Sequence, residues 1–141
     1  IAPAGGSRSR ATAATVEGRQ HFIKMKGNEV FKFAVRILGK VADDALAKAG
    51  IRQQDVDLLI PHQANSRIIE AAIKRLNLPR EKVEVNLDKY GNMSTASIPV
   101  ALDEAWKSGK IKPGSHVLLV GFGAGLTYGA AVLRWTQKTG G

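Results

Sequence analysis

The chain has 141 residues, of which 44% are hydrophobic and 23% charged, a composition typical of one globular domain. It contains no cysteine, which excludes disulfides, cysteine-ligated metals and a cysteine nucleophile within these residues, and we expect no metal site. The formal net charge of +9 favours an acidic partner, but dispersed basic residues and few aromatic ones argue against nucleic acid.

Residues 1–20 are rich in glycine, serine, arginine, alanine and threonine, which predicts a loop or connecting segment. The chain begins at Ile1 rather than at Met and has no signal-peptide pattern, which suggests a processed, truncated or cut chain. Residues 21–141 are expected to form the folded domain, opening with a short extended stretch over residues 21–26. No run of about 18 apolar residues occurs, so we expect no membrane span.

Three amphipathic helices are predicted where apolar residues recur at helical spacing. The first begins at Asn28, the expected N-cap, and ends before Gly50, which suits the position just after a helix. The second follows Asn65 and ends at Asn77, and the third is stopped by Gly109.

Four strands are predicted, over residues 57–60, 83–87, 117–120 and 127–135. The first and third are short apolar runs typical of buried strands, and the second alternates apolar with polar residues. A glycine-rich turn separates the last two strands. Helices that alternate with strands in this way imply an α/β layered domain with a mostly parallel sheet.

The stretch Pro61-His62-Gln63-Ala64-Asn65 stands where an expected strand gives way to a helix. In open α/β sheets, ligands bind just outside the carboxyl ends of strands. The imidazole of His62 can donate a hydrogen bond or exchange a proton near neutral pH. A histidine with a purely structural role is the plainer alternative.

Two further stretches precede or follow expected strands. Tyr90-Gly91-Asn92-Met93-Ser94-Thr95-Ala96-Ser97 offers the amide of Asn92, which can stabilise an oxyanion without titrating, although a turn with a helix cap explains it as well. Gly121-Phe122-Gly123-Ala124-Gly125 superficially suggests a dinucleotide fingerprint, but a strand follows it and the chain ends before the required acidic residue. Its backbone N–H groups could instead face a reacting oxygen.

In this order and at these spacings, the three stretches closely resemble the C-terminal half of the 3-oxoacyl-[acyl-carrier-protein] synthase III family. Gly27-Asn28-Glu29-Val30-Phe31-Lys32-Phe33-Ala34-Val35 resembles the helix that precedes the histidine motif in that family. The resemblance runs from about Gly6 to Trp135, which is nearly the whole chain.

The resemblance implies a thiolase-like α/β fold in which each half is a mixed five-stranded sheet flanked by helices, with residues 21–141 as the second half. Members of the family transfer an acetyl group from acetyl-CoA to a cysteine and condense it with malonyl-acyl-carrier protein. This decarboxylative step gives acetoacetyl-carrier protein and initiates type II fatty-acid synthesis. The cysteine belongs to the first half, so we expect this chain to be inactive alone.

The resemblance further implies a bacterial, cytoplasmic acyltransferase that needs no cofactor and carries out a single function. Its expected partners are coenzyme A thioesters, an acidic acyl-carrier protein and the N-terminal half of the same enzyme. The complete enzyme is expected to be a homodimer.

By its motifs, the resemblance assigns catalytic roles to His62 and Asn92, which would stabilise the enolate left by decarboxylation of the malonyl thioester. The backbone N–H of Ala124 is the candidate donor at a second oxyanion site. The residues expected along the pantetheine arm of coenzyme A are Gly27, Asn28, Phe31, Ala64 and Asn65. Those expected to dock the carrier protein, or else to form a solvated basic face, are Lys32, Arg67, Lys74 and Arg75.

One departure from the family pattern keeps a second enzyme class open. Met93 follows Asn92 where the family usually has threonine, and Gly-Asn-Met-Ser is more typical of chalcone-synthase-like polyketide synthases, although those lack Gln-Ala-Asn after the histidine. The alternative enzyme is therefore a synthase-III-like or chalcone-synthase-like acyltransferase of secondary metabolism. An alternative from another class is a binding module for carrier protein or coenzyme A without turnover.

Overall fold

The computed structural model describes residues 2–136, so Ile1 and residues 137–141 lie outside the described residues. The described chain falls into two compact units that divide after Lys32. The first unit contains the short helix α1 (Ala13–Glu17), which Thr12 caps by accepting a hydrogen bond from the backbone N–H of Thr15. This helix lies within residues 1–20, which were predicted from composition to be a loop. Composition does not reveal it, because the capping contact that stabilises it involves only two residues.

The second unit is built on a three-stranded mixed sheet with the strand order β1-β2-β3. β1 (Leu58–Pro61) pairs in parallel with β2 (His116–Gly123). β2 forms an antiparallel hairpin with β3 (Thr127–Arg134), which is one of the two edge strands. The expected α/β class and mixed sheet are confirmed. The expectation of a mostly parallel sheet is wrong, because the longer pairing, β2 with β3, is antiparallel, as the short turn between these strands requires. The part of the chain that the structure describes contains three strands rather than five.

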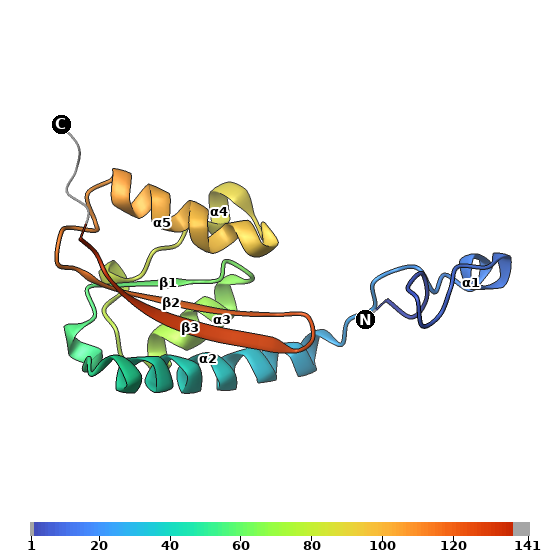
Figure 1. Cartoon of the computed structure of the whole chain (residues 1–141), viewed down its shortest axis with the longest axis horizontal. Coiled ribbons are helices and arrows are strands. Elements are labelled where there is room, and N and C mark those ends of the chain that lie inside the picture. Colours follow the sequence, from blue (N-terminus) through green and yellow to red (C-terminus); the bar gives the residue numbers. More distant parts are fainter. Residues whose placement is uncertain (1, 137–141) are drawn as a thin grey trace. The chain divides into compact units, whose positions relative to one another are not determined.

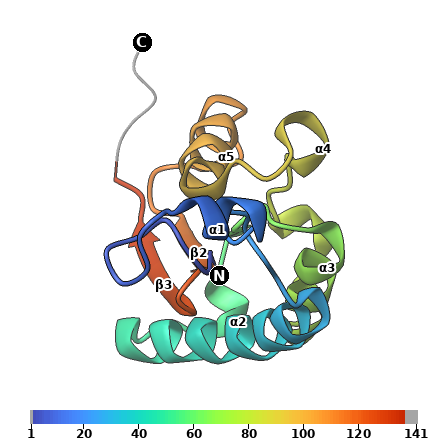
Figure 2. The ribbon, with the colours of Figure 1, turned by 90° about the vertical axis from the view of Figure 1, so that its right-hand side faces the viewer.

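Helices lie on both faces of this sheet (Figure 1 and Figure 2). α2 (Gly27–Ala49) covers one face with α3 (Ser66–Arg75) beside it, and α5 (Ser97–Lys107) covers the other. Successive strand residues point to opposite faces, so both faces of the buried strands carry apolar side chains. The core on the α5 side consists of Leu58, Ile60, Ala101, Ala105, Ile111 and Val117. The helices of the other face bury Ala34, Leu38, Ala42, Leu46, Ile68, Ile69, Ala72 and Ile73.

The ends of the helices follow most of the sequence signals. Asn65 caps α3 by accepting a hydrogen bond of 2.9 Å from the backbone N–H of Arg67, as predicted. Gly50 follows α2 with a φ of 66°, a conformation that glycine adopts without strain. The prediction for Asn28 is wrong: α2 already begins at Gly27, and Asn28 lies in its first turn.

The strand predicted over residues 83–87 is also wrong. It shrinks to a single parallel bridge between Val83 and Leu59, after which the chain forms the short helix α4 (Leu87–Tyr90). A parallel ladder continued from this bridge would need a backbone N–H at position 61, and Pro61 has none. Apolar alternation therefore predicted a strand whose neighbour cannot supply the next hydrogen bond.

Single turns of 3₁₀ helix complete the unit, at Gln53–Asp55, Arg80–Lys82 and Ser94–Ala96. The last of these leads directly into α5. Among residues 2–136, no helix has the length and apolar character needed to cross a membrane.

Candidate functional site

His62 stands at the carboxyl end of β1, where its backbone N–H donates a 2.8 Å hydrogen bond to the carbonyl of Val120 in β2. The imidazole is half-buried, and its Nδ1 lies 2.6 Å from Oγ of Ser97, the first residue of α5. Burial lowers the pKa of His62, because desolvation disfavours the charged imidazolium. The ring is therefore mainly neutral at pH 7, and its Nε2 bonds to no group of residues 2–136.

Strand β2 forms a second wall beside the histidine. The ring of Phe122 meets the ring of His62 edge-on, with the ring centres 5.6 Å apart. A Cβ atom placed on Gly121 would lie 3.3 Å from Cδ1 of Ile98 and 3.8 Å from Cβ of His62. The missing side chain at Gly121 thus allows β2, the histidine loop and α5 to approach one another closely.

Asn92 is exposed in the turn between α4 and the 3₁₀ turn Ser94–Ala96. Its Oδ1 accepts a 2.9 Å hydrogen bond from the backbone N–H of Ser94. Because a backbone N–H needs an acceptor, this bond identifies the oxygen of the amide and leaves the NH₂ group to donate elsewhere. No bond within residues 2–136 joins His62 and Asn92 directly; Ser97, five residues after Asn92, is what contacts the imidazole.

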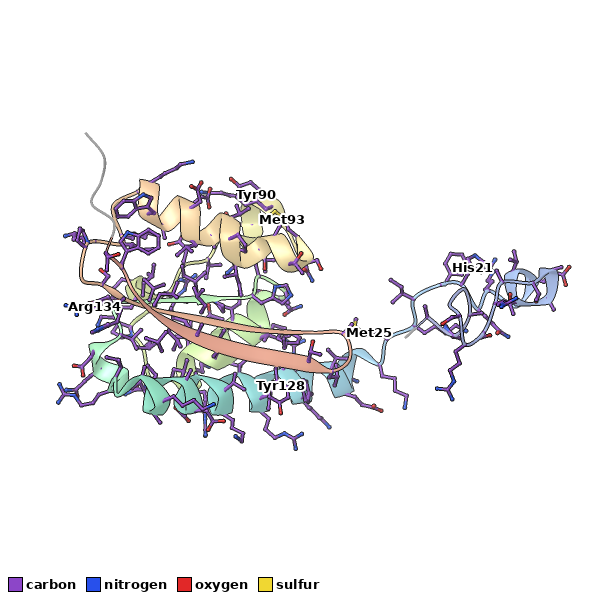
Figure 3. The ribbon with its side chains drawn as sticks, viewed as in Figure 1. His21, Met25, Tyr90, Met93, Tyr128 and Arg134 are labelled. Atoms are coloured by element: carbon purple, nitrogen blue, oxygen red, sulfur yellow. The ribbon has the colours of Figure 1, made fainter. Side chains whose placement is uncertain are left out.

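Helix α4, which leads to Asn92, is held against α5 by Glu104. The carboxylate accepts hydrogen bonds from Nδ2 of Asn86 (2.7 Å), Oη of Tyr90 (2.8 Å) and Nζ of Lys89 (3.4 Å). Figure 3 shows Tyr90 beside α5. These bonds, that of Asn86 first, lower the pKa of Glu104. One side chain of α5 therefore fixes the helix from which the Asn92 turn begins.

The side chain of Gln63 fills the gap where the ladder between β1 and residues 83–86 stops. Its Nε2 donates to the carbonyls of Pro61 (2.8 Å) and Glu84 (3.3 Å), and its Oε1 accepts from the backbone N–H of Asn86 (3.1 Å). Gln63 is fully buried. The amide group thus takes the place of a strand peptide and ties the histidine loop to the segment before α4.

Ala124 lies in the exposed turn of the β2–β3 hairpin, where its carbonyl accepts a 3.2 Å hydrogen bond from the hydroxyl of Thr127. Within residues 2–136, its backbone N–H donates to no other group. An open hollow of about 540 Å³ runs along the hairpin and reaches Thr95 and Ile98. Neither His62 nor Asn92 lines this hollow, although two of its lining residues, Gly121 and Phe122, lie beside the histidine.

The residues expected along the pantetheine arm divide between the two units. Ala64 and Asn65 lie two and three residues after His62, and the N–H of Ala64 donates to the carbonyl of His62 (2.9 Å). Gly27, Asn28 and Phe31 lie in the first turns of α2, within the unit of residues 1–32.

Three of the residues expected to dock a carrier protein, Arg67, Lys74 and Arg75, are exposed on α3, and Lys32 is exposed on α2 in the first unit. Arg75 also packs on α2: a Cβ on Gly39 would lie only 2.5 Å from its Cγ. Its guanidinium lies 4.0 Å from the carboxylate of Asp43. Arg75 therefore helps to join α2 and α3, whereas Lys74 forms no ion pair with any of the described residues.

Sequence reasoning missed the roles of Ser97, Gln63 and Glu104 in this site. The hydroxyl of Ser97 was expected only as a helix cap, yet no side chain caps α5, and Ser97 contacts a histidine 35 residues away. Gln63 gave one available signal: it is a polar residue just after the apolar strand β1, and a polar side chain that is buried there requires hydrogen-bond partners. No feature of the sequence indicated that Glu104 would hold α4.

Residues 46–135 match the family described as 3-oxoacyl-[acyl-carrier-protein (ACP)] synthase III C terminal. Over 134 residues the chain is 60% identical to the beta-ketoacyl-[acyl-carrier-protein] synthase III of Clostridioides difficile (strain 630), a match that covers 95% of this chain and 41% of the relative. The chain thus spans about two fifths of the length of the curated relatives it matches.

Solved structures give the same result for the fold. The crystal structure of 3-oxoacyl-[acyl-carrier-protein] synthase III from Aquifex aeolicus VF5 is 50% identical, with a TM-score of 0.79, over 89% of this chain and 39% of that one. The priming beta-ketosynthase of the R1128 polyketide pathway is 39% identical, with a TM-score of 0.75, over 82% of this chain and 35% of that one.

Proposed function

Because the chain belongs to the 3-oxoacyl-[acyl-carrier-protein] synthase III family, as a C-terminal part of it, we propose that it supplies the histidine and asparagine of a condensing enzyme. The complete protein transfers the acetyl group of acetyl-CoA to a cysteine and joins it to malonyl-acyl-carrier protein, giving acetoacetyl-carrier protein. The contact between Nδ1 of His62 and Oγ of Ser97 carries this proposal, since it holds the imidazole at the start of the helix that follows Asn92.

The proposed chemistry uses two uncharged donors. The C–C bond to the malonyl carboxylate breaks and carbon dioxide leaves, and the electron pair moves to the thioester, whose oxygen becomes an enolate. Nε2–H of His62 and the NH₂ of Asn92 donate to that oxygen. The α-carbon then attacks the acyl thioester of the cysteine and expels the thiolate, which restores the free thiol after protonation.

The second oxyanion arises on the acyl thioester while it is attacked. The backbone N–H of Ala124 is the donor that we propose there, and its lack of another partner within residues 2–136 supports this role. The thiol must come from outside the 141 residues, which contain no cysteine. We therefore propose that this chain alone has no condensing activity.

Further residues are proposed to bind the pantetheine arm of the substrate and the carrier protein. Ala64 and Asn65, next to His62, are proposed to contact the pantetheine arm, together with Gly27, Asn28 and Phe31 of α2. The exposed basic residues proposed to dock the acidic carrier protein are Lys32, Arg67, Lys74 and Arg75. The complete protein is proposed to act as a cytoplasmic homodimer without a cofactor.

The test separates the two half-reactions in the complete protein. His62→Ala and Asn92→Ala should each lower the rate of malonyl decarboxylation by about 10²–10³. Acetyl transfer from acetyl-CoA to the cysteine should stay within about threefold of the unchanged protein, because neither side chain carries the acyl group. Radiolabelled acetyl transfer and carbon dioxide release measure the two steps separately.

His116→Ala is the matched control, since this histidine begins β2 and bonds to the carbonyl of Asp55 instead. It should leave both half-reactions unchanged. Full decarboxylation in the His62 and Asn92 variants would contradict the proposed function.

A polyketide-priming acyltransferase is the second candidate, favoured by Met93 after Asn92 and by the 39% identity to a priming beta-ketosynthase. The two functions differ in the acyl thioester and carrier protein that they accept. Steady-state rates of the complete protein with acetyl-CoA and longer acyl-CoA primers would separate them: a preference for acetyl-CoA of at least about tenfold favours fatty-acid initiation.

A further inference from the structure

Ser97 is a buried serine that serves no purpose as a helix cap. It is fully buried, although it is the first residue of α5. The N-cap position of α5 is occupied by Ala96, and no side chain bonds to the free N–H groups of that helix end. Serine usually stands at a helix start to make such a bond. The hydroxyl therefore has another role.

The hydroxyl of Ser97 has two hydrogen-bond partners among residues 2–136. The backbone N–H of Gln63 donates to Oγ at 3.2 Å, so the oxygen acts as an acceptor there. The only other partner of Oγ within residues 2–136 is Nδ1 of His62, at 2.6 Å. A buried hydroxyl proton left without an acceptor costs about 1–3 kcal/mol. The proton of Ser97 therefore points to Nδ1, which must be unprotonated to accept it.

We propose that Ser97 is a positioning residue that holds His62 as the neutral tautomer with its ring proton on Nε2. Two fixed points support this assignment. The N–H of Gln63 orients Oγ, and the ring of Phe122 packs against the ring of His62. The backbone of His62 is itself fixed by its bond to Val120. The ring of His62 thus has a fixed position, and its proton is held on Nε2.

The consequence for catalysis rests on the proposed function. An oxyanion needs a donor at Nε2, and the alternative tautomer, with the proton on Nδ1, would present a lone pair there. A lone pair facing an enolate repels it. Ser97 thereby selects the form of His62 that can donate, without touching substrate.

The first test uses the 141-residue chain and does not depend on activity. Nitrogen-15 correlation spectra of the labelled imidazole at pH 8 distinguish the two neutral tautomers. We expect His62 to show a protonated Nε2 and an unprotonated Nδ1. In Ser97→Ala, its Nδ1 signal should move toward that of the exposed His21. A protonated Nδ1 in the unchanged chain would overturn the proposal.

The second test uses the complete protein and compares Ser97→Ala with Ser108→Ala. Ser108 ends the same helix and its hydroxyl donates to the carbonyl of Ala105, far along α5 from the histidine. Ser97→Ala should lower kcat for malonyl decarboxylation by about tenfold, less than the 10²–10³ typical of losing a donor outright. KM for malonyl-carrier protein should stay close to that of Ser108→Ala, whereas the unfolding midpoint should be lower, because the buried N–H of Gln63 loses its acceptor.

The outcomes separate the two proposals. An unchanged kcat in Ser97→Ala, or a loss of kcat matched by a rise in KM of the same size, would show that the serine only packs. If the Nε2–H tautomer is found but His62→Ala retains full decarboxylation, the proposed function fails and the role of Ser97 in setting the tautomer stands.

Discussion

Buried uncharged polar side chains hold the loop at the centre of this molecule at the scale of single residues. Gln63 and Ser97 are both fully buried, and each satisfies more than one partner. Satisfied polar groups of this kind restrict the chain to one arrangement, because any other arrangement leaves a donor or acceptor unpaired. They fix the loop that carries His62.

Replacing Gln63 with methionine should therefore lower the free energy of unfolding by about 2 kcal/mol. Methionine fills a similar volume but leaves the N–H of Asn86 and the carbonyls of Pro61 and Glu84 without the amide that pairs with them. Urea unfolding of the 141-residue chain, followed by circular dichroism, measures the change.

Gln54→Met is the matched control, since Gln54 is exposed and its substitution should change stability by less than about 0.5 kcal/mol. Equal stability of the two variants would mean that the buried amide contributes nothing.

Several single residues were readable from the sequence because their roles are local. Asn65 caps the helix that begins one residue later, and Gly50 ends the helix before it with a positive φ. The partners of Ser97 lie 34 and 35 residues away, and two partners of the Gln63 side chain lie 21 and 23 residues away, so no local pattern reveals them. The catalytic assignments of His62 and Asn92 came from resemblance and stay predictions.

At the scale of secondary structure, α4 is the element that depends most on its neighbours. Four residues are too few to form a stable helix alone. Glu104 compensates by accepting hydrogen bonds from Asn86, Lys89 and Tyr90, which span that helix. The Asn92 turn therefore depends on a carboxylate of α5 that must be ionised to accept all three.

The stability that Glu104 provides should depend on pH. Its pKa is lowered in the folded chain, so its contribution is complete above the ordinary value of 4.5 and is lost as the pH falls through the lower folded pKa. Glu104→Gln should be less stable than the unchanged chain at pH 7 and should lose less stability on acidification. Unfolding midpoints between pH 7 and pH 3 test this.

Glu81→Gln provides the comparison, because Glu81 is exposed and forms no ion pair within residues 2–136. Its midpoint should follow that of the unchanged chain at every pH. Parallel curves for all three proteins would contradict the anchoring role of Glu104.

The elements that were predicted correctly are the three helices with long apolar periodicity, α2, α3 and α5, and the apolar strands β1, β2 and β3. The strand expected over residues 83–87 failed because alternation reports only which side chains are buried. Whether a strand forms there depends on the backbone of the neighbouring strand, and Pro61 cannot donate. α4 was missed because its stability comes from α5.

At the scale of the whole molecule, the net charge of +9 is the most general property with a functional consequence. Long-range attraction speeds the encounter with an acidic partner, and salt screens it over about 10 Å at 0.1 M. The position of the charges still matters, because a docking face requires exposed basic residues that are not already paired with acidic residues of the chain itself. Lys74, exposed on α3 without an ion pair among the described residues, meets that requirement.

Lys74→Glu should weaken binding of the acidic carrier protein by about tenfold at low salt, and the difference should shrink as salt rises. Lys112→Glu makes the same change in charge at an exposed site before β2 and should weaken binding less than about twofold. Calorimetric titration of each variant of the 141-residue chain with carrier protein, at about 20 mM and about 300 mM salt, measures the two affinities.

An equal loss in the two variants would show that only net charge matters and that α3 is not the docking face. No salt-sensitive binding at all would remove the carrier protein as a partner of this chain.

β3 closes the sheet on one side with eight residues, and only Arg134 among them is charged. Within residues 33–136, one row of its peptide groups has no strand to pair with, and unpaired edges of this length join edges of other molecules. A concentrated sample is consequently at risk of pairing edge to edge into assemblies. A lysine introduced at an outward position of this strand is the simplest safeguard when the chain is handled by itself.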